Sequence, residues 1–151
     1  MAVNIEMLLG EIEKKWGGKY TKQRDRRFFL EINKDNLQSV VSFLKENGLY
    51  HLSTITGVDS GEQFEVLYHL DLQGEIITIR VPISKDNPQL STITNLIPGA
   101  VLYEREVQDI LGIKFLGHPD PRRLILPDDW PEGVYPLRKD WKYDRASGII
   151  K

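Results

Sequence analysis

The densest group of reactive side chains in the sequence lies within one six-residue stretch. Glu104, Arg105, Glu106 and Asp109 bring together three carboxylates and a guanidinium, and carboxylates can serve in metal binding or acid–base chemistry. On a helix, however, Glu104 and Glu106 point about 200° apart, so they cannot chelate one ion. Arg105 and Asp109 stand four residues apart and can form an ion pair. The pattern favours a charged helix face whose ion pairs lie within the chain or between subunits.

A second candidate is His118, which precedes Pro119 and Asp120. A His–Asp pair can act as a general base, so a stand-alone enzyme built on His118 with Asp120 or Glu104 is one hypothesis. The three histidines show no HxxxH or HxxE spacing typical of zinc sites, and neither a phosphate-binding glycine loop nor a nucleophile elbow occurs. With no cysteine, thiol catalysis and the usual iron–sulfur ligands are also excluded. We therefore expect no catalytic residue, metal ion or cofactor in this chain.

Two pairs of adjacent cations remain, Arg122-Arg123 and Arg138-Lys139. Arginine forks recognise carboxylates and phosphates well. Residues 118–145 nevertheless contain six acidic and six basic side chains. That balance argues against a nucleic-acid-binding tail and favours ion pairs that fix one register of an extended segment on a protein partner.

A further basic stretch runs from Lys22 to Arg27. Together with Arg122-Arg123 it allows a third hypothesis, a nucleic-acid-binding module. The net charge of the whole chain is −2, so no overall field attracts nucleic acid. We interpret the stretch as a solvated strand edge.

The elements that must position these residues follow from hydrophobic periodicity. Helices are predicted at residues 4–16, 35–47 and 98–111, where apolar residues recur at helical spacing. Strands are predicted around 28–32 and 49–58, and alternation across residues 63–83 around Gln73-Gly74 predicts a hairpin. We expect an α+β fold in which a small antiparallel or mixed sheet, arranged as a meander, carries helices on one face.

The amino-acid composition of the chain changes after Gly112. Five of the eight prolines fall between Pro119 and Pro136, which excludes a regular helix or central strand there. The same segment is rich in Leu, Ile, Trp and Tyr, whereas disordered segments are poor in them. The sequence thus predicts a compact α+β domain at 1–112 and an extended Pro-, Arg- and aromatic-rich docking tail at 113–151.

The sequence predicts neither a membrane-spanning helix nor a signal peptide. The longest apolar runs are far short of the roughly 20 residues that a membrane-spanning helix needs. Met7-Leu8-Leu9 is too short for the apolar core of a signal peptide, and Glu6 and Glu11 interrupt it. We expect a protein without a membrane span that stays in the cytosol or docks on something from the cytosolic side.

The C-terminal motifs stand in one ordered run and resemble a known family. The run comprises Glu104-Arg105-Glu106, Asp109, Gly112-Ile113-Lys114-Phe115, Gly117-His118-Pro119-Asp120, Arg122-Arg123-Leu124 and Pro136-Leu137-Arg138-Lys139-Asp140. It is similar to the signature of the thirty-kilodalton subunit family of respiratory complex I, with a close match over about residues 98–141. That family has counterparts in energy-converting membrane-bound nickel–iron hydrogenases and related ferredoxin-driven complexes. The stretch Asp128–Pro136 resembles the archaeal, hydrogenase-type branch, and the NADH- and quinone-linked type is the alternative.

The resemblance implies a non-catalytic structural subunit in the peripheral arm of an ion-translocating membrane complex, on the cytoplasmic side. Its implied partners are the large catalytic-type subunit and the small iron–sulfur subunit. Iron–sulfur clusters, and in the hydrogenase branch a nickel–iron centre, are expected in those partners, with no redox centre here. The residues expected to dock are Glu104, Arg105, Glu106, Asp109, His118, Asp120, Arg122, Arg123, Tyr135, Arg138, Lys139 and Asp140.

Overall fold

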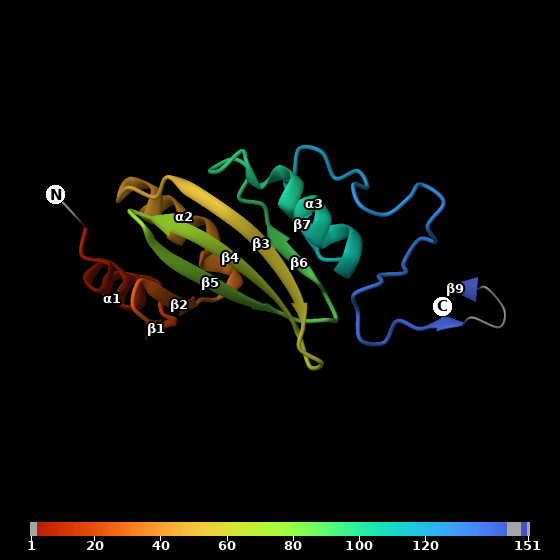
Figure 1. The fold of residues 1–151 in the computed structure, drawn as a ribbon, viewed down its shortest axis with the longest axis horizontal. Helices are drawn as coiled ribbons and strands as arrows, with labels where there is room; N and C mark the ends of the chain where they lie inside the picture. Colours follow the sequence, from red (N-terminus) through yellow and green to blue (C-terminus); the bar gives the residue numbers. More distant parts are fainter. Residues whose placement is uncertain (1–2, 145–148, 151) are drawn as a thin grey trace.

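A mixed five-stranded sheet forms the centre of the protein (Figure 1). The computed structural model describes residues 3–144, 149 and 150. The strand order is β1-β2-β5-β4-β3, so β1 and β3 are the two edges. The strands are β1 (Lys19–Arg24), β2 (Arg27–Glu31), β3 (His51–Asp59), β4 (Phe64–Leu72) and β5 (Glu75–Ile83).

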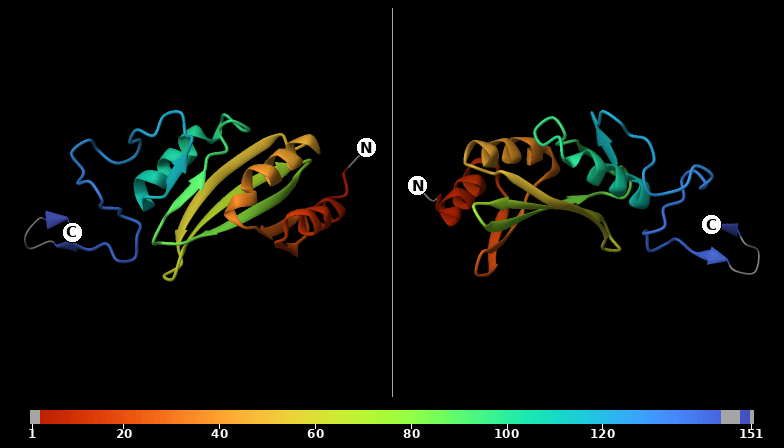
Figure 2. Two further views of the ribbon diagram at one scale, coloured as in Figure 1. Left: turned by 180° about the vertical axis from the view of Figure 1, so that it is seen from behind. Right: turned by 45° about the horizontal axis from the view of Figure 1, so that its top comes forward.

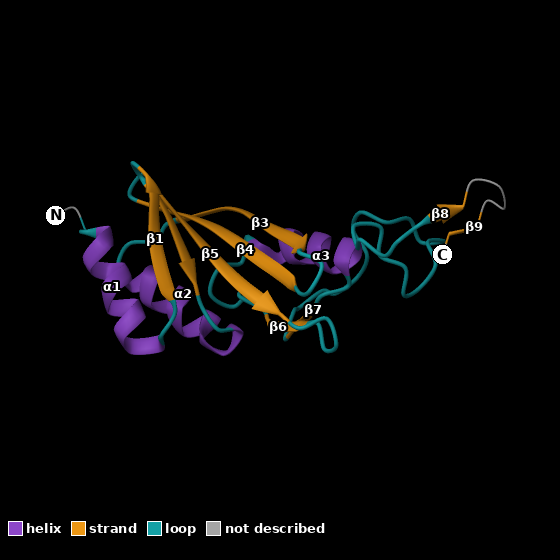
Figure 3. Cartoon of the chain, turned by 90° about the horizontal axis from the view of Figure 1, so that it is seen from below, coloured by secondary structure: helices purple, strands orange, loops and turns teal. Residues whose placement is uncertain are grey.

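Three helices cover one face of this sheet and leave the other face open (Figures 2 and 3). They are α1 (Ile5–Trp16), α2 (Leu37–Glu46), which follows the 3-10 turn η1 (Lys34–Asn36), and α3 (Ala100–Leu111). The predicted α+β class with helices on one face is therefore confirmed. Among the described residues, no helix is long and apolar enough to cross a membrane.

The core lies between the helices and the sheet because the central strands alternate strictly. In β4 every second side chain from Phe64 to Leu72 is buried, while the residues between them are half-exposed. β5 turns back after Gln73 and Gly74, which both have positive φ, as a tight two-residue hairpin turn demands. The predicted 63–83 hairpin is confirmed.

One expectation about the sheet was wrong. A meander would be antiparallel throughout, but β2 pairs with β5 in parallel, in a register that sets Phe29 opposite Thr78. After β2 the chain forms α2, then β3 and β4, and then β5. In the sheet, β5 lies between β2 and β4. Residue patterns show which side chains are buried but not which strand lies beside which, so a crossover of this kind is decided by tertiary packing.

Helix α3 sits close to strand β3 at a glycine. Gly57 pairs with Val66 and therefore faces the helices. A Cβ atom at Gly57 would lie 2.5 Å from Leu111 Cδ1 and 2.9 Å from Val107 Cγ1. The missing side chain thus allows the close approach that fixes α3 over β3.

The chain after α3 begins inside the domain and then leaves regular structure. Strand β7 (Lys114–Leu116) pairs in parallel with β6 (Gln89–Ser91), and Ile113 and Phe115 are buried in the core. From residue 117 to 142 there is neither helix nor strand, and this stretch, called the tail below, extends away from the sheet (Figure 1). The short strands β8 (Tyr143–Asp144) and β9 (Ile149–Ile150) follow. The irregular C-terminal segment was predicted, whereas the division at 112/113 stays a prediction.

Candidate protein–protein interface on helix α3 and the tail

The outer side of α3 holds the first part of the tail through its backbone carbonyls. Arg105 donates from Nε to the carbonyl of Arg122 and from Nη2 to that of Arg123, both at 2.9 Å. One turn further on, Gln108 Nε2 donates to the carbonyl of Pro121 at 3.0 Å. Two side chains on one helix face thereby satisfy three consecutive carbonyls of a segment that has no secondary structure of its own.

Asp109 holds the same segment through its N–H groups. Its buried Oδ2 accepts hydrogen bonds from the backbone N–H groups of Leu124, Ile125 and Leu126, at 2.7, 2.8 and 3.2 Å. Consecutive N–H groups of this kind form an anion-binding concavity, which is filled here by a carboxylate of the chain itself. The expected pair between Arg105 and Asp109 does not form, because each side chain binds the tail instead.

Glu104, on the same helix, points into the core. It is fully buried, and it accepts hydrogen bonds from the Ile93 N–H at 2.8 Å and from Thr92 Oγ1 at 2.5 Å. Burial raises the pKa of Glu104, against the opposing effect of those hydrogen bonds and of nearby His118. A side chain without exposed surface cannot contact a partner directly, so Glu104 supports the interface from inside.

His118 is fixed where the tail leaves the domain. Its Nε2 lies 3.1 Å from the Val101 carbonyl and 3.8 Å from Glu104 Oε2, while its Nδ1 accepts the backbone N–H of Asp120 at 3.0 Å. Both ring nitrogens are thus engaged, which leaves no free nitrogen for a general base. The arrangement argues against the enzyme hypothesis and makes His118 a connector between α3 and the tail.

The Asp120 carboxylate forms a cluster with two arginines. Arg122 Nε and Nη2 lie 2.6 and 2.8 Å from its two oxygens, and Arg105 Nη1 lies 3.4 Å away. The hydrogen bonds from Arg122 lower the pKa of Asp120 well below its ordinary value, with a further contribution from Arg105. Arg122 itself keeps 81% of its side chain exposed.

A second anchor fixes residues 135–138 at the end of α3. Arg138 Nε donates to the Leu111 carbonyl at 2.8 Å, and its guanidinium lies 4.3 Å from the centre of the Tyr135 ring and 5.0 Å from that of Phe64. Gly112, in the left-handed region at φ 73°, lies beneath them, and a Cβ there would come within 2.5 Å of Tyr135. Cation–π contacts and a glycine therefore hold this part of the tail.

The third anchor is a residue that the sequence did not single out. Asp59, at the end of β3, is buried and accepts the backbone N–H groups of Lys139 at 2.9 Å and Gly61 at 2.9 Å, and its Oδ1 lies 2.6 Å from Lys85 Nζ. Burial alone would raise its pKa, but the hydrogen bonds from Lys85, Lys139 and Gly61 outweigh burial and lower the pKa to about 2. The sequence offered only the turn signal Asp59-Ser60-Gly61, which says nothing of a contact 80 residues away.

Arg123 closes the loop between the segment that Arg105 and Asp109 hold and the segment that is fixed at the end of α3. Its Nη1 donates to the carbonyls of Pro127 at 2.9 Å and Trp130 at 2.6 Å, and Trp130 Nε1 donates to the Val134 carbonyl at 2.9 Å. Arg122 and Arg123 are adjacent in sequence but differ in environment, since one is exposed and the other braces a loop. The side chains of Lys139 and Asp140 are exposed, and Glu106 is half-buried.

Large apolar side chains are exposed mainly in this half of the molecule. Of eight such residues among the described part of the chain, six belong to α3, β7, the tail or β8. They are Leu102, Leu116, Leu124, Ile125, Leu137 and Tyr143, each 40% to 57% exposed. Several backbone groups of the tail are bonded within the chain, while Leu124, Ile125 and Leu137 are exposed alongside charged side chains such as Asp128 and Glu132.

Two adjoining hollows lie between α3 and the tail. One, of about 530 Å³, is lined by residues that include Gly112, Leu116 and His118, and the other, of about 350 Å³, by residues that include Asp109 and Arg123. Both are bordered by Gln108, Pro121 and Tyr135. The surface between α3 and the tail therefore has relief, which shape-complementary docking requires, and the exposed Leu116 lines one of its hollows.

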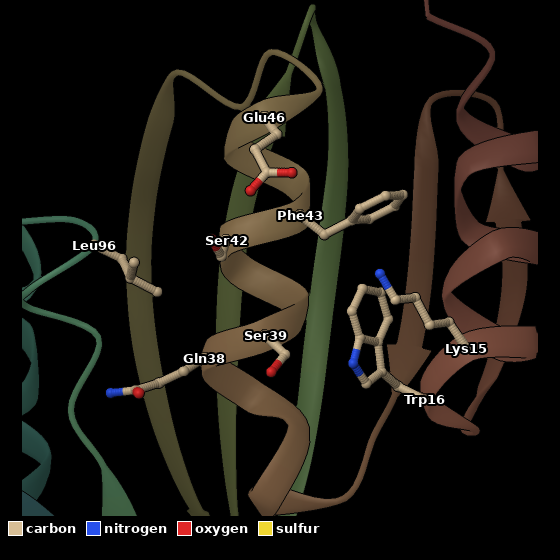
Figure 4. A pocket seen from close by; sticks show the side chains of 8 residues that line it. All are labelled: Lys15, Trp16, Gln38, Ser39, Ser42, Phe43, Glu46 and Leu96. Carbon is tan, nitrogen blue, oxygen red and sulfur yellow. The ribbon is translucent and has the colours of Figure 1, made fainter.

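A separate hollow of about 350 Å³ lies between α1 and α2 (Figure 4). Lys15 Nζ lies 4.5 Å above the ring of Trp16, which in turn meets Phe43 edge-on at 5.3 Å. None of the twelve residues predicted to dock lines this hollow. It is a surface distinct from the interface on α3 and the tail.

The described residues form no metal site. Across residues 3–144 and the pair 149–150, no three His, Asp or Glu side chains gather in a group that could hold an ion. That the chain binds no cofactor stays a prediction, and so does the docking role of the twelve residues.

Known proteins share both the sequence and the fold. The membrane-bound hydrogenase subunit beta of Pyrococcus furiosus is 35% identical in an alignment of 134 residues that covers 85% of this chain and 73% of the relative. The C/D-type NADH-quinone oxidoreductase subunit of Phocaeicola vulgatus is 43% identical in an alignment of 104 residues that covers 66% of this chain but 19% of that longer protein. A chain in the solved structure of the membrane-bound sulfane sulfur reductase, an archaeal respiratory membrane complex, superposes with a TM-score of 0.81 at 27% identity, over 95% of this chain and 86% of that one.

These relatives are subunits of oxidoreductase complexes, as their names state, and they include both hydrogenase and NADH-quinone types. The model of the family described as respiratory-chain NADH dehydrogenase, 30 Kd subunit, matches residues 30–147. The motif run and the α+β fold agree with that match, which spans most of the sequence. The chain belongs to the family of the 30 kDa subunit of the respiratory-chain NADH dehydrogenase.

Proposed function

We propose that this chain is a non-catalytic structural subunit in the peripheral arm of a membrane-bound, ion-translocating oxidoreductase. In this proposal α3 and the tail clasp the large catalytic-type subunit near the terminal iron–sulfur cluster, on the cytoplasmic side. One observation carries the proposal: of the eight large apolar side chains that are exposed among the described residues, six belong to α3, β7, the tail or β8. Apolar surface gathered in this way on a soluble domain is typical of a protein–protein interface.

The anchors prepare the tail for docking. Three sets of contacts hold it: those of Arg105 and Asp109 on α3, the bond from Arg138 to the Leu111 carbonyl at the end of α3, and the bond from Lys139 to Asp59. Because those contacts already order its backbone, little conformational entropy is lost when a partner binds. The structure thus supports docking of a shaped surface rather than folding of a loose segment on its partner.

The contacting residues differ from those expected from motifs alone. Leu124, Ile125 and Leu137 are exposed and suit the role of apolar anchors, while Arg122 suits the polar rim. Most of the polar motif residues hold the tail in shape instead. Their contribution to docking is therefore indirect, through the backbone that they position.

The relatives support the choice of partner and leave the overall reaction to other chains. In the Phocaeicola vulgatus relative the matched part is 19% of one longer chain, so this domain and a much larger remainder are covalently joined there. Both hydrogenase and NADH-quinone names occur among the relatives, which fits a subunit whose structural role is compatible with either chemistry. The hydrogenase-type branch is our choice and the quinone-linked type the alternative, with iron–sulfur and nickel–iron centres assigned to the partners.

The test is co-purification of the double variant Leu124→Asp, Ile125→Asp with an affinity-tagged large subunit. Two carboxylates in an apolar contact would release the variant from the complex. Because the N–H groups of both residues bind Asp109, hydrogen exchange of residues 124–126 in the isolated variant checks that the tail keeps its shape. The matched control is Met7→Asp with Tyr50→Asp, which changes exposed apolar residues outside this surface. Retention of the Leu124, Ile125 variant at the control level would refute the proposed surface.

A second test separates the two adjacent arginines. Arg122→Glu should weaken co-purification and lower the melting temperature of the isolated chain only slightly, because Arg122 is exposed and its pair with Asp120 is screened by solvent. Arg123→Glu should lower the melting temperature, because it removes two hydrogen bonds within the tail loop. Equal effects of the two variants on melting would contradict this assignment.

A further inference from the structure

The hairpin formed by β1 and β2 carries a concentration of positive charge that the proposed interface does not use. Residues 19–27 contain five cations and one acid, whereas the whole chain has a net charge of −2. The five cations are exposed. Within the part of the chain that the structure describes, the one ion pair they make joins Lys22 Nζ to Glu6 at 2.8 Å.

Two features of the hairpin are unfavourable for folding: a pair of like charges and a turn residue with positive φ. Arg24 pairs directly with Arg27 across the two strands, although like charges in that arrangement are destabilising. Arg26, in the turn between them, has a φ of 57°, in the left-handed region that glycine or asparagine usually occupies in hairpin turns. Such local conflicts are expected where a residue serves binding rather than folding.

Part of the backbone beside these cations is available for pairing. β1 is an edge of the sheet (Figure 3) and pairs with β2 alone, but the Tyr20 N–H already donates to Glu13 Oε1 at 2.6 Å and the register shifts between Lys22 and Arg24. On the open face next to it lies a hollow of about 290 Å³, whose lining residues include Phe29, the cations Lys19 and Arg80, and the acid Glu31. An extended segment along β1 would find backbone partners, a site for an apolar side chain and nearby cations.

We propose that β1 is a second docking site, which binds an acidic extended segment of a partner protein by strand addition. Backbone hydrogen bonds would supply affinity, and Lys19, Arg24, Arg26 and Arg27 would select for carboxylates. The proposal is independent of the interface on α3 and the tail.

Charge distribution favours an acidic peptide over other polyanions. Glu6, Asp25 and Glu75 line a hollow on the helix side of the same hairpin, together with Lys22 and Arg26. A flat anionic membrane or a long nucleic acid pressed on the hairpin would meet those carboxylates as well. A single strand on the outer edge can avoid them and follow the cations.

The experiment uses the full chain and a soluble peptide of four Glu-Val repeats, with a Lys-Val peptide of equal length as the probe control. We expect the Glu-Val peptide to protect the β1 amides from hydrogen exchange and to bind more weakly as salt is raised. Lys19→Glu with Arg24→Glu should reduce affinity at least about tenfold, because two attractive charges become repulsive. Lys114→Glu with Lys142→Glu, an equal change of charge at exposed positions in β7 and the tail, should leave affinity within about twofold, since distant exposed charges are screened.

The variant Arg26→Gly separates a loss of peptide binding from a loss of folding. Glycine relieves the positive-φ backbone, so this variant should melt at a higher temperature than the parent while binding the Glu-Val peptide more weakly. Failure of the peptide to protect β1, equal binding of the Lys-Val peptide, or tighter binding of phosphatidylglycerol vesicles or single-stranded DNA than of Glu-Val would each overturn the proposal. Because the proposed large-subunit surface is tested by co-purification of other variants, the two proposals can fail separately.

Discussion

Asp59 Oδ2 accepts a hydrogen bond from the backbone N–H of Lys139, at 2.9 Å, and so ties the end of β3 to a tail residue 80 positions later in the chain. The other oxygen of the same carboxylate, Oδ1, forms an ion pair with Lys85 Nζ and accepts a hydrogen bond from the N–H of Gly61. With the contacts made by α3, this bond means that the tail is held at both ends of its irregular stretch. The shape of the proposed interface therefore depends on residues far from it in sequence.

The first prediction concerns Asp59 and pH. Hydrogen bonds hold the pKa of Asp59 at about 2, below the ordinary 3.8, despite burial. The folded state thus favours the ionised form of Asp59, so the stability that this carboxylate contributes is complete above about pH 4 and is lost as pH falls from 3.8 towards 2.

Asp59→Asn should lower the free energy of unfolding by about 2 kcal/mol at about pH 7. Urea denaturation of both proteins from about pH 7 down to about pH 2 should show the difference shrinking at low pH. With Asp86→Asn as the exposed control, a difference independent of pH would contradict the prediction.

The second prediction concerns the carboxylate that holds residues 124–126. Asp109→Ala removes the acceptor of three backbone N–H groups, so hydrogen exchange of those amides should accelerate and the free energy of unfolding should fall by about 2 kcal/mol. Glu106→Ala, on the same helix, is the control and should change neither. If residues 124–126 kept their protection in Asp109→Ala, the carboxylate would not be what orders the tail.

The third prediction concerns Glu104, whose pKa is raised by burial. Because the folded state favours the protonated form, stability is greater below the unfolded pKa and declines as pH rises through that value to the folded pKa. Glu104→Gln cannot ionise and should escape this decline. The stability of Glu104→Gln relative to the parent should therefore improve as pH rises from about 4, as measured by chemical denaturation. Glu106→Gln should show no such trend, and a flat difference for Glu104→Gln would refute the assignment.

The fourth prediction concerns the contact between β3 and α3. Gly57→Val would place side-chain atoms where Leu111 and Val107 now lie, and overpacking of this kind costs about 1–3 kcal/mol. Because α3 carries Arg105 and Asp109, displacement of the helix should also speed hydrogen exchange in the tail. Ser53→Val, at an exposed position of the same strand, controls for the change of residue type. A variant with normal stability and a protected tail would show that α3 is positioned otherwise.

Much of the architecture can be predicted from local patterns. Alternation in Phe64–Leu72 and in Glu75–Ile83 predicts the central hairpin, and helical spacing predicts all three helices to within a few residues, because burial on one face imposes a period on the sequence. Proline density predicts that no helix or central strand follows Gly112, since proline lacks the N–H that either would need. The ordered motif run identifies the family.

Tertiary structure alone decides which groups meet. Arg105 and Asp109 stand at helical pairing distance, yet each binds tail backbone, because an ordered segment beside them offers unsatisfied carbonyls and N–H groups. The register that sets Arg24 opposite Arg27 follows from strand pairing, not from residue type. The parallel pairing of β2 with β5 is likewise absent from local patterns. Periodicity reports burial along one element, whereas hydrogen-bond partners depend on elements brought together from distant parts of the chain.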